Sequence, residues 1–445
     1  MARYISSKYN YIHRNEDGDE IVFNTYTQKL LKVRQSDEKH FLRVLEEGTC
    51  DYEKYKILID YGILVEETFD EAKYLQMLYN EMVYSTDTLY IKLMPTIDCN
   101  FKCTYCFERH ESIRFSEETV AKVIAFLKKQ IPQCKQFRIS LFGGEPLLCY
   151  NEIIEICKAA TELCKKNKIP MYGEMSTNGY LLTSDKVRTL LKYHITNYQV
   201  CVDGTEPFHN ALRPHRFEQN SYETIIKNLI DIRDNVNSSI LSIGLRANVN
   251  KYNYSCMKEH IDNMATLFKD SCNFYMCYQC VRDWGGESID RDQLIIEEQS
   301  VYRELYYYSV SKGLKAMYNG AFASIVGNCQ ACRKNGYCIT PDGNLVKCDL
   351  AYFDKTYRDI SIVGTIAENG SMSIEKGKLA EWIVSKEPSS ACKECILFPH
   401  CMGGHCAYSR NIIKTVQCAK YSISILDGYI RDMDLQGKIE LFKDV

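Results

Sequence analysis

Three cysteines stand close together in the stretch DCNFKCTYCFERH, residues 98–110, at the spacing C-x3-C-x2-C. They are Cys99, Cys103 and Cys106, and no fourth cysteine stands beside them. A structural zinc site takes four protein ligands, and a [4Fe–4S] cluster normally takes four thiolates. Three thiolates can hold three irons and leave the fourth iron for a small molecule that donates nitrogen and oxygen. A zinc knuckle and chance spacing are the alternative interpretations.

Cysteine is abundant throughout this chain, which has 22 of them in 445 residues. In a reducing compartment, so many cysteines indicate metal binding rather than disulfides. Single cysteines in apolar patterns, such as Cys157, Cys164 and Cys201, are predicted to be small buried hydrophobic residues. A second group lies toward the end of the sequence: Cys329, Cys332, Cys338, Cys348, Cys392, Cys395, Cys401, Cys406 and Cys418.

The overall composition excludes several classes of protein. A net charge of −3 gives no electrostatic reason to expect nucleic acid or a membrane surface as partner. No apolar run reaches the length of a transmembrane helix, and the start MARYISSKYNYIHRNEDGDE does not have the pattern of a signal peptide. We therefore expect a cytoplasmic protein. A length of 445 residues predicts two or three domains.

From about residue 88, strand-like and helix-like patterns alternate regularly. Six such units predict an α/β fold with a parallel sheet and right-handed crossovers, either open or curled toward a barrel. Chemistry collects at the carboxyl ends of the strands in such folds. Polar and glycine residues do follow the predicted strands, at Cys99, Gly143, Asn178, Asp203 and Asn248. The predicted strands cover 88–96, 137–146, 171–180, 198–204, 240–250 and 273–281.

The first 85 residues predict a small unit of strands and helices. A hairpin is expected to turn at Asp17-Gly18. A helix should follow from an N-cap at Ser36 to a stop at Gly48, then a short helix, a turn at Gly62 and a returning strand. Residues 69–85 predict a linking helix, and residues 422–442 a helical tail after the cysteine-rich region.

The stretch CNFKCTYCF resembles the signature of the radical S-adenosylmethionine (radical SAM) superfamily. The resemblance implies that Cys99, Cys103 and Cys106 hold a [4Fe–4S] cluster that binds the methionine end of S-adenosylmethionine (SAM). The cluster would pass one electron to the sulfonium, and the resulting 5′-deoxyadenosyl radical would abstract hydrogen from a substrate carbon. The fold implied is a partial (β/α)6 barrel.

Further motifs follow in the order that this superfamily shows. The resemblance implies that GGEP meets the α-amino group of SAM, that the face of Glu174 and Ser176 contacts the ribose, and that Arg246 pairs with the carboxylate. GGEP and Asn178-Gly179 are also compatible with simple turns, and Arg246 with a structural arginine. The full set of implied cofactor-binding residues is Tyr105, Gly143, Gly144, Glu145, Pro146, Glu174, Ser176, Asn178, Asp203 and Arg246.

The cysteine-rich end resembles a SPASM domain, which holds two auxiliary [4Fe–4S] clusters and would bring the total to three. The resemblance implies Cys392, Cys395, Cys401 and Cys418 on the distal cluster. It implies Cys348 and Cys406 on the nearer one, with further ligands from Cys329, Cys332 and Cys338. The stretch CMGGHC has the spacing C-x4-C where the family usually has C-x3-C. A zinc ribbon is the alternative.

The resemblance divides the chain into a winged-helix-like domain over 1–85, a radical SAM barrel over 86–315 and a SPASM domain over 316–445. The first would bind the leader of a ribosomally made precursor peptide by adding a strand to a sheet edge; a cap that binds nothing is the alternative. A flavodoxin or ferredoxin would donate electrons.

Two reactions compete for the substrate. One is a crosslink in the precursor peptide, either a thioether from a Cys sulfur to carbon, of the sactionine or ranthipeptide type, or a C–C or C–O bond. The other is formylglycine formation by an anaerobic sulfatase-maturating enzyme. Asp349, directly after Cys348, is the candidate base in both reactions, or simply a solvated turn residue. A non-enzymatic iron–sulfur or zinc protein is the third class.

Overall fold

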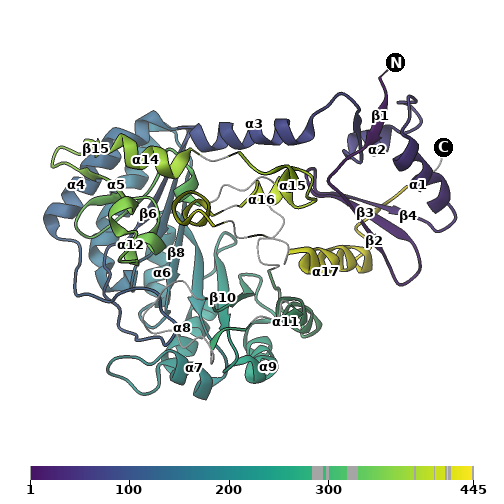
Figure 1. The fold of residues 1–445 in the computed structure, drawn as a ribbon. Coiled ribbons are helices and arrows are strands. Elements are labelled where there is room, and N and C mark those ends of the chain that lie inside the picture. The colour runs from purple at the N-terminus through teal and green to yellow at the C-terminus, as the bar shows by residue number, and fades with distance from the viewer. Residues whose placement is uncertain are drawn as a thin grey trace. The chain divides into compact units, whose positions relative to one another are not determined.

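The computed structural model describes residues 2–282, 294–296, 300–317, 329–384, 387–404, 406–415, 418 and 422–442. They form two compact units (Figure 1). The first comprises residues 2–83 with 387–442, and the second comprises 84–317 with 329–384. The predicted cysteine-rich domain over 316–445 is therefore divided between the two units. The division of the sequence into three domains over 1–85, 86–315 and 316–445 stays a prediction.

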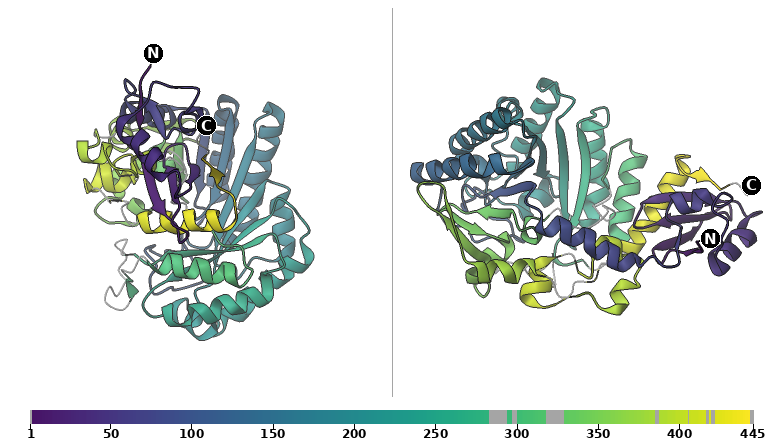
Figure 2. Two further views of the ribbon diagram at one scale, coloured as in Figure 1. Left: turned by 90° about the vertical axis from the view of Figure 1, so that its right-hand side faces the viewer. Right: turned by 90° about the horizontal axis from the view of Figure 1, so that it is seen from above.

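The second unit is built on the predicted parallel sheet. Its strands stand in the order β11-β10-β9-β8-β7-β6, all parallel. Helices that follow these strands pack outside the curved row (Figure 2). The prediction of an α/β fold with six parallel strands is thus confirmed. The strands are β6 (Thr88–Leu93), β7 (Gln136–Leu141), β8 (Met171–Thr177), β9 (Ile195–Cys201), β10 (Ser242–Val249) and β11 (Phe274–Cys280).

Three of the helices that follow these strands begin with a polar side-chain cap. Ser116 accepts a hydrogen bond from Thr119 N at 3.1 Å, and Thr183 and Asn220 cap two later helices in the same way. Apolar residues at helical spacing cover the sheet, as in α5, where Ile153, Ile156 and Ala160 are buried. The helices are α4 (Glu117–Gln130), α5 (Tyr150–Asn167), α6 (Ser184–Leu191), α7 (Glu206–Leu212), α8 (Ser221–Asn235), α9 (Met257–Phe268) and α11 (Ser300–Ser311).

The sheet continues beyond β6 with strands that sequence reasoning did not predict. β12 (Gly336–Ile339) runs parallel to β6, and the antiparallel strands β13 (Asn344–Val346), β14 (Ile362–Ile366) and β15 (Met372–Ile374) follow it. Short helices complete this part of the unit: α12 (Asp349–Phe353), α13 (Arg358–Ser361) and α14 (Lys376–Ile383). The extension brings Cys338 and Cys348 to the side of the first barrel strand.

One buried histidine of α9 makes the stability of this unit sensitive to acid. Burial lowers the pKa of His260 to about 4, from an ordinary value near 6.5. Between pH 6.5 and 4, the His260 imidazole therefore binds a proton in the unfolded chain but not in the folded one. The free energy of unfolding has its full value above pH 6.5 and falls as the pH drops toward 4. The loss over that range is about 3 kcal/mol. In urea unfolding, a His260→Leu variant should lose less stability between pH 6.5 and 4.5 than the unaltered chain, and an equal loss would contradict this assignment.

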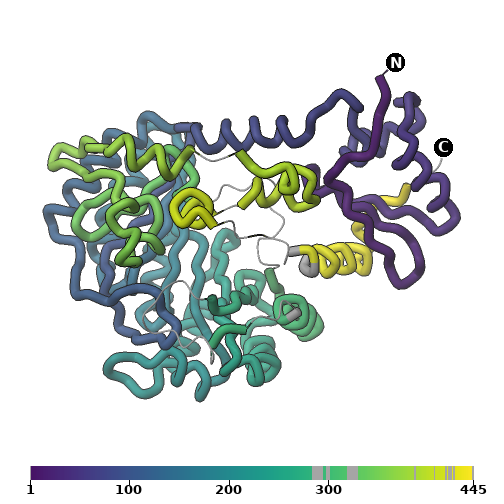
Figure 3. Tube along the Cα trace, viewed as in Figure 1, coloured from purple at the N-terminus to yellow at the C-terminus, as the bar shows by residue number. Residues whose placement is uncertain are grey.

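The first unit joins the start of the sequence to residues 387–442. A sheet in the order β16-β4-β3-β2 forms its centre. Figure 3 shows the purple and yellow parts of the trace side by side there. The predicted hairpin is confirmed: β2 (Asn10–Arg14) and β3 (Glu20–Asn24) pair across a turn in which Gly18 has φ +84°. Further strands are β1 (Tyr4–Ser6), β4 (Lys29–Val33), β5 (Leu64–Glu66) and β16 (Glu440–Leu441).

Helices cover both faces of this sheet. Val22, Leu31 and Val33 pack with α1 and α2 on one face, whereas Ile21, Phe23 and Leu30 pack with α17 on the other. The helices are α1 (Glu38–Glu47), α2 (Lys56–Asp60), α3 (Glu71–Tyr84), α15 (Ser390–Lys393), α16 (Phe398–Cys401) and α17 (Ser422–Leu435).

Two local predictions for this unit are wrong. Asp37, not Ser36, stands at the start of α1, and its side chain makes no capping hydrogen bond. The predicted helix over 422–442 ends at Leu435, because Gly437 at φ +65° reverses the chain and residues 440 and 441 become a strand. The stop at Gly48 and the turn at Gly62 are confirmed. Within the described residues, the structure has no helix with the length and hydropathy of a membrane span.

Candidate functional site

The three clustered cysteines lie in the loop that follows β6, at the carboxyl edge of the parallel sheet. Asp98 fixes the start of this loop, because its carboxylate accepts hydrogen bonds from Cys99 N at 2.9 Å, Arg114 at 3.0 Å and Arg216 at 2.8 Å. Burial opposes ionisation of Asp98, but the two arginines outweigh it and lower the pKa of this carboxyl. The loop is therefore held to the protein by a charged anchor.

The three thiols of this loop are neighbours and have the chemistry that a metal cluster requires of its ligands. Burial raises the pKa of Cys99, Cys103 and Cys106, and each thiol also interacts electrostatically with another of the three. The structure describes all 22 cysteines of the chain and joins none of them in a disulfide. No three His, Cys, Asp or Glu side chains of the described residues already have the arrangement of a metal site. The loop thus offers three neighbouring thiols that a metal would have to deprotonate and draw together.

The GGEP segment packs directly against the cysteine loop. Gly144 N donates to Thr96 O at 3.1 Å, and Glu145 N donates to Asp98 O at 2.9 Å. A Cβ on Gly143 would lie 2.3 Å from Thr96 O, and one on Gly144 would lie 2.0 Å from Asp98 O. The glycines are therefore required for close approach of two backbones, in addition to any approach of a ligand.

Glu145 links this segment to the next strand end. Its carboxylate is fully buried and accepts hydrogen bonds from Leu147 N at 3.0 Å, Thr177 Oγ1 at 2.8 Å and Asn178 N at 2.8 Å. Burial raises the pKa of Glu145, although these partners oppose the shift. Asn178 in turn donates to Asn100 Oδ1 at 2.7 Å, inside the cysteine loop. The end of β7, the end of β8 and the cysteine loop thus form one bonded assembly.

A second polar network joins the ends of β9 and β10. Asp203 is fully buried; its carboxylate accepts hydrogen bonds from Asn248 N at 2.7 Å and from the hydroxyl of Tyr105. Arg213 donates to the Tyr105 hydroxyl at 2.6 Å and lies 3.5 Å from the Asp203 carboxylate. Burial raises the pKa of Tyr105 well above its usual range, so the phenol stays neutral. Sequence reasoning missed Arg213, which follows α7, the helix that comes after the Asp203-Gly204 strand end.

The predicted ribose and carboxylate contacts lie on neighbouring strands of the sheet. Glu174 and Ser176 share the less buried face of β8, and Glu174 accepts a hydrogen bond from the Tyr90 hydroxyl at 3.2 Å. Arg246 donates to Asn248 Oδ1 at 2.9 Å and to Gln199 Oε1 at 3.0 Å. The roles of all three toward SAM stay predictions.

Asp349 lies beside charged groups that no sequence pattern singled out. Its carboxylate is 3.1 Å from Nζ of Lys92 on β6, and this Nζ lies 4.6 Å above the ring centroid of Phe142. Burial opposes ionisation of Lys92, but Asp349 raises its pKa. Glu108 interacts electrostatically with both groups; its Oε2 is buried without a hydrogen-bond partner among the described residues, and burial raises its pKa well above the usual range. A base candidate and a neutral acid therefore lie next to the cysteine loop.

Four of the predicted auxiliary-cluster cysteines lie in the second unit. Cys338 is fully buried on β12 and accepts a hydrogen bond from Gln330 at 3.2 Å, and Cys332 N donates to Cys329 O at 3.2 Å. Cys348 interacts electrostatically with Cys329 and Cys338. The predicted ligands of the first unit are Cys392, Cys395, Cys401, Cys406 and Cys418. The interleaved pairing of the two sets stays a prediction.

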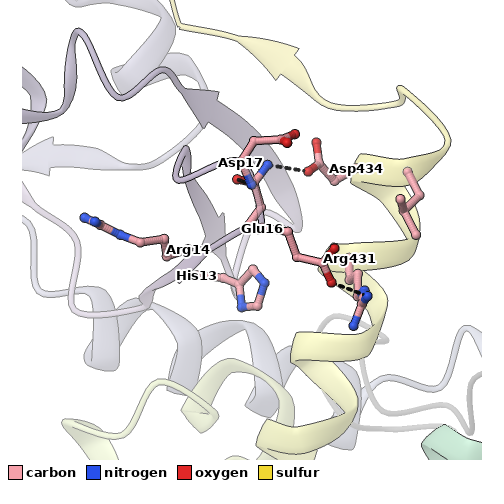
Figure 4. A pocket seen from close by; sticks show the side chains of 8 residues that line it. His13, Arg14, Glu16, Asp17, Arg431 and Asp434 are labelled. Carbon is pink, nitrogen blue, oxygen red and sulfur yellow. Dashed lines mark hydrogen bonds and ion pairs between the residues drawn. The ribbon is translucent and has the colours of Figure 1, made fainter.

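A notch of about 330 Å³ lies in the first unit between the β2–β3 turn and α17 (Figure 4). Several of its charged groups have partners: Arg431 pairs with Glu16, and Asp434 accepts a hydrogen bond from Asn15 at 2.7 Å. Among the described lining residues there is no cysteine, so the notch lacks the clustered thiols of the cysteine loop.

Part of this chain matches a known protein family. Residues 93–263 match the radical SAM superfamily, so this part of the chain is a radical SAM domain. The matched residues include the cysteine loop, the GGEP segment and the carboxyl ends of β7, β8, β9 and β10. The domain implies SAM and one [4Fe–4S] cluster as cofactors, and Cys99, Cys103 and Cys106 are the residues that would hold the cluster.

Individual relatives resemble this chain over different lengths. GTP 3′,8-cyclase of Haemophilus influenzae is 31% identical over 134 residues, 29% of this chain, so the chain spans only 38% of that relative. The cysteine-type anaerobic sulfatase-maturating enzyme of Clostridium perfringens is 21% identical over 69% of this chain and 85% of its own length. These similarities leave the activity and substrate of this chain to be proposed.

Two solved structures share the fold. Native anSMEcpe with bound AdoMet has a TM-score of 0.57 at 17% identity, covering 78% of this chain and 97% of that one. Streptococcus suis SuiB bound to its precursor peptide SuiA has a TM-score of 0.50 at 16% identity, covering 94% and 99%. At such identities the likeness shows the fold alone.

Proposed function

We propose that this chain is a radical SAM maturase that installs a crosslink in a ribosomally made precursor peptide, with a Cys thioether as the favoured bond. The supporting observation is that the fold of SuiB is shared over 94% of this chain, whereas that of anSMEcpe is shared over 78%. The SuiB structure contains a precursor peptide. The small sheet of the first unit is the element we assign to leader binding.

Cys99, Cys103 and Cys106 would hold the cluster, which with SAM would supply radical chemistry that removes hydrogen from a substrate carbon. The residues of this chain orient the reactants and exclude water. Asp98, Glu145 and Asn178 hold the cysteine loop against the ends of β7 and β8. Asp203, Tyr105 and Arg213 fix the neighbouring strand ends.

Asp349 is the residue we assign to the substrate proton. A thiol must lose its proton before its sulfur can form a bond to carbon, and a carboxylate within reach can accept it. The ammonium group of Lys92 at 3.1 Å holds this carboxylate in place. We further propose that the cysteine-rich segments hold two auxiliary [4Fe–4S] clusters, which would make three in total.

Formylglycine formation is the second candidate, because the sulfatase-maturating relative aligns over 85% of its own length. The base that follows Cys348 suits that reaction equally well. C–C or C–O crosslinking of a peptide is a further alternative.

An anaerobic assay distinguishes these reactions. The reconstituted full chain, with SAM and a reductant, is given either a Cys-bearing peptide encoded beside its gene or a Cys peptide from a sulfatase. We expect the first peptide to become two hydrogens lighter and to lose its reactive thiol. A sulfatase peptide that gains a hydrazine-reactive aldehyde would favour formylglycine formation, and release of 5′-deoxyadenosine with neither peptide changed would contradict both.

A further inference from the structure

One edge of the sheet in the first unit is covered by a segment from far along the sequence. Glu440 and Leu441 of β16 pair in parallel with Leu31 and Lys32 of β4. Phe442 N then donates to Lys32 O at 2.7 Å. We call residues 439–442 the strap. Figure 1 shows this short strand beside β4.

The strap is anchored by one aromatic side chain. Phe442 is only 2% exposed, and its ring meets that of Phe41 on α1 edge-on, with 5.7 Å between ring centroids. Val44 and Leu58 belong to the same cluster, so these residues form a socket for a flat apolar group. Ile439 packs instead with the α17 side of the sheet, so the strap passes around the β4 edge from one face to the other.

A polar contact of the strap shows which kind of side chain this edge favours next to the socket. The hydroxyl of Tyr61 donates to the Glu440 carboxylate, and Nζ of Lys29 lies 5.5 Å from the centroid of the Tyr61 ring. This part of the edge therefore favours an acidic side chain two positions before the aromatic one.

The strap has few contacts compared with the helix before it. Lys438 N donates to Met433 O at 3.0 Å and Gly437 N to Asp434 O at 2.9 Å, so α17 is closed before the strap begins. Leu426 and Ile430 of α17 are fully buried and would keep the helix in place if the strap left. Beyond Lys438, the contacts described for the strap are the pairing of Glu440 and Leu441 with β4, the Tyr61–Glu440 hydrogen bond, the Phe442 amide and the side chains of Ile439 and Phe442. Such a segment can open locally without unfolding the unit.

We propose that the β4 edge and the Phe442 socket form a docking site for an extended peptide with an acidic residue two positions before an aromatic one, and that the strap is an intramolecular competitor which the peptide displaces. A strand can add to the edge through the outward N–H and C=O groups of β4 while its aromatic side chain enters the socket. The identification of this peptide with the precursor rests on the proposed function. The displacement of the strap by a peptide at the β4 edge, which we call the exchange, does not.

Peptide binding to the full chain tests the exchange. The probe is a labelled synthetic peptide with the sequence of residues 436–445, QGKIELFKDV, and fluorescence anisotropy is read on the anaerobically reconstituted chain without reductant. While the strap occupies the β4 edge, the probe cannot bind there, so the strap lowers the apparent affinity of the chain for the probe. Phe442→Ala should weaken the strap and therefore tighten binding of the probe by about tenfold or more. Leu435→Ala, at a residue that is 76% exposed at the end of α17, should not change it. A probe with alanine at the phenylalanine position should not bind.

Equal affinity for the unaltered and Phe442→Ala chains would overturn the proposal, since the probe would then be using another surface such as the β2 edge. A Phe442→Ala chain that stays folded and binds no probe would also overturn the proposal. Hydrogen exchange on the unaltered chain gives a test without any variant. The Phe442 amide should exchange about 100-fold faster than that of Ile430, and equal rates would show that the strap does not open alone. A chain that binds the probe but modifies no peptide contradicts only the proposed function.

Discussion

Replacing Gly144 with alanine is expected to reduce reductive cleavage of SAM by about 100-fold or more. The added Cβ would lie 2.0 Å from Asp98 O, a backbone atom that cannot turn aside. Asp98 directly precedes Cys99, so the cysteine loop must shift to admit the methyl group. A displacement of about 1 Å in a positioned reacting group can cost 100-fold in rate.

The matched control for this substitution is Gly377→Ala. Gly377 lies on an exposed part of α14, and a Cβ there would meet nothing within 4 Å. Its rate of 5′-deoxyadenosine formation should equal that of the unaltered chain. If Gly144→Ala also kept the full rate, the close packing of GGEP against the cysteine loop would have no part in binding SAM.

Changing Asp349 to asparagine is expected to separate the two halves of the reaction. Loss of a general base costs about 100-fold or more, so modification of the peptide should fall by that factor. Cleavage of SAM should stay within a few-fold, because Asp349 pairs with Lys92 and makes no hydrogen bond to the cysteine loop in the described residues. Mass spectrometry of the peptide and chromatography of 5′-deoxyadenosine measure the two yields in one reaction.

Asp359→Asn is the control for this charge change, since its carboxylate is 91% exposed and pairs with Lys378 at 3.2 Å. It should leave both yields unchanged. An Asp349→Asn chain that modified peptide at the full rate would remove Asp349 from the proton transfer. Equal losses of peptide product and 5′-deoxyadenosine would instead assign it to the site where SAM is cleaved.

The barrel and the cysteine loop could be predicted from the sequence because both depend on local patterns. Each parallel strand is an apolar run followed by a turn, and C-x3-C-x2-C is short enough to recognise without any fold. GGEP was also predicted to lie near the loop, but as a ligand contact. Its packing against Thr96 and Asp98 depends on two backbones that meet only in the folded sheet.

Residues that act through distant contacts left no such pattern. Lys92 belongs to an ordinary alternating strand, and only the position of Asp349, 257 residues later, makes it part of the site. Arg213 and Glu108 likewise become notable only through their burial beside Asp203 and Lys92. The strap was predicted as the end of a helix, because the apolar residues Ile439, Leu441 and Phe442 fit the spacing of a helix as well as that of a strand. In the structure the helix has already ended before Gly437, and a short strand follows.

We propose that the loop of Cys99, Cys103 and Cys106 binds a cluster that cleaves SAM. The direct measurement is the yield of 5′-deoxyadenosine and methionine from SAM when the anaerobically reconstituted chain is reduced with dithionite. We expect both products from the unaltered chain and from Cys272→Ala, which removes an exposed cysteine elsewhere. We expect neither product when all three loop cysteines are replaced by alanine. An unchanged yield from that triple variant would show that these three cysteines do not hold the cluster that cleaves SAM.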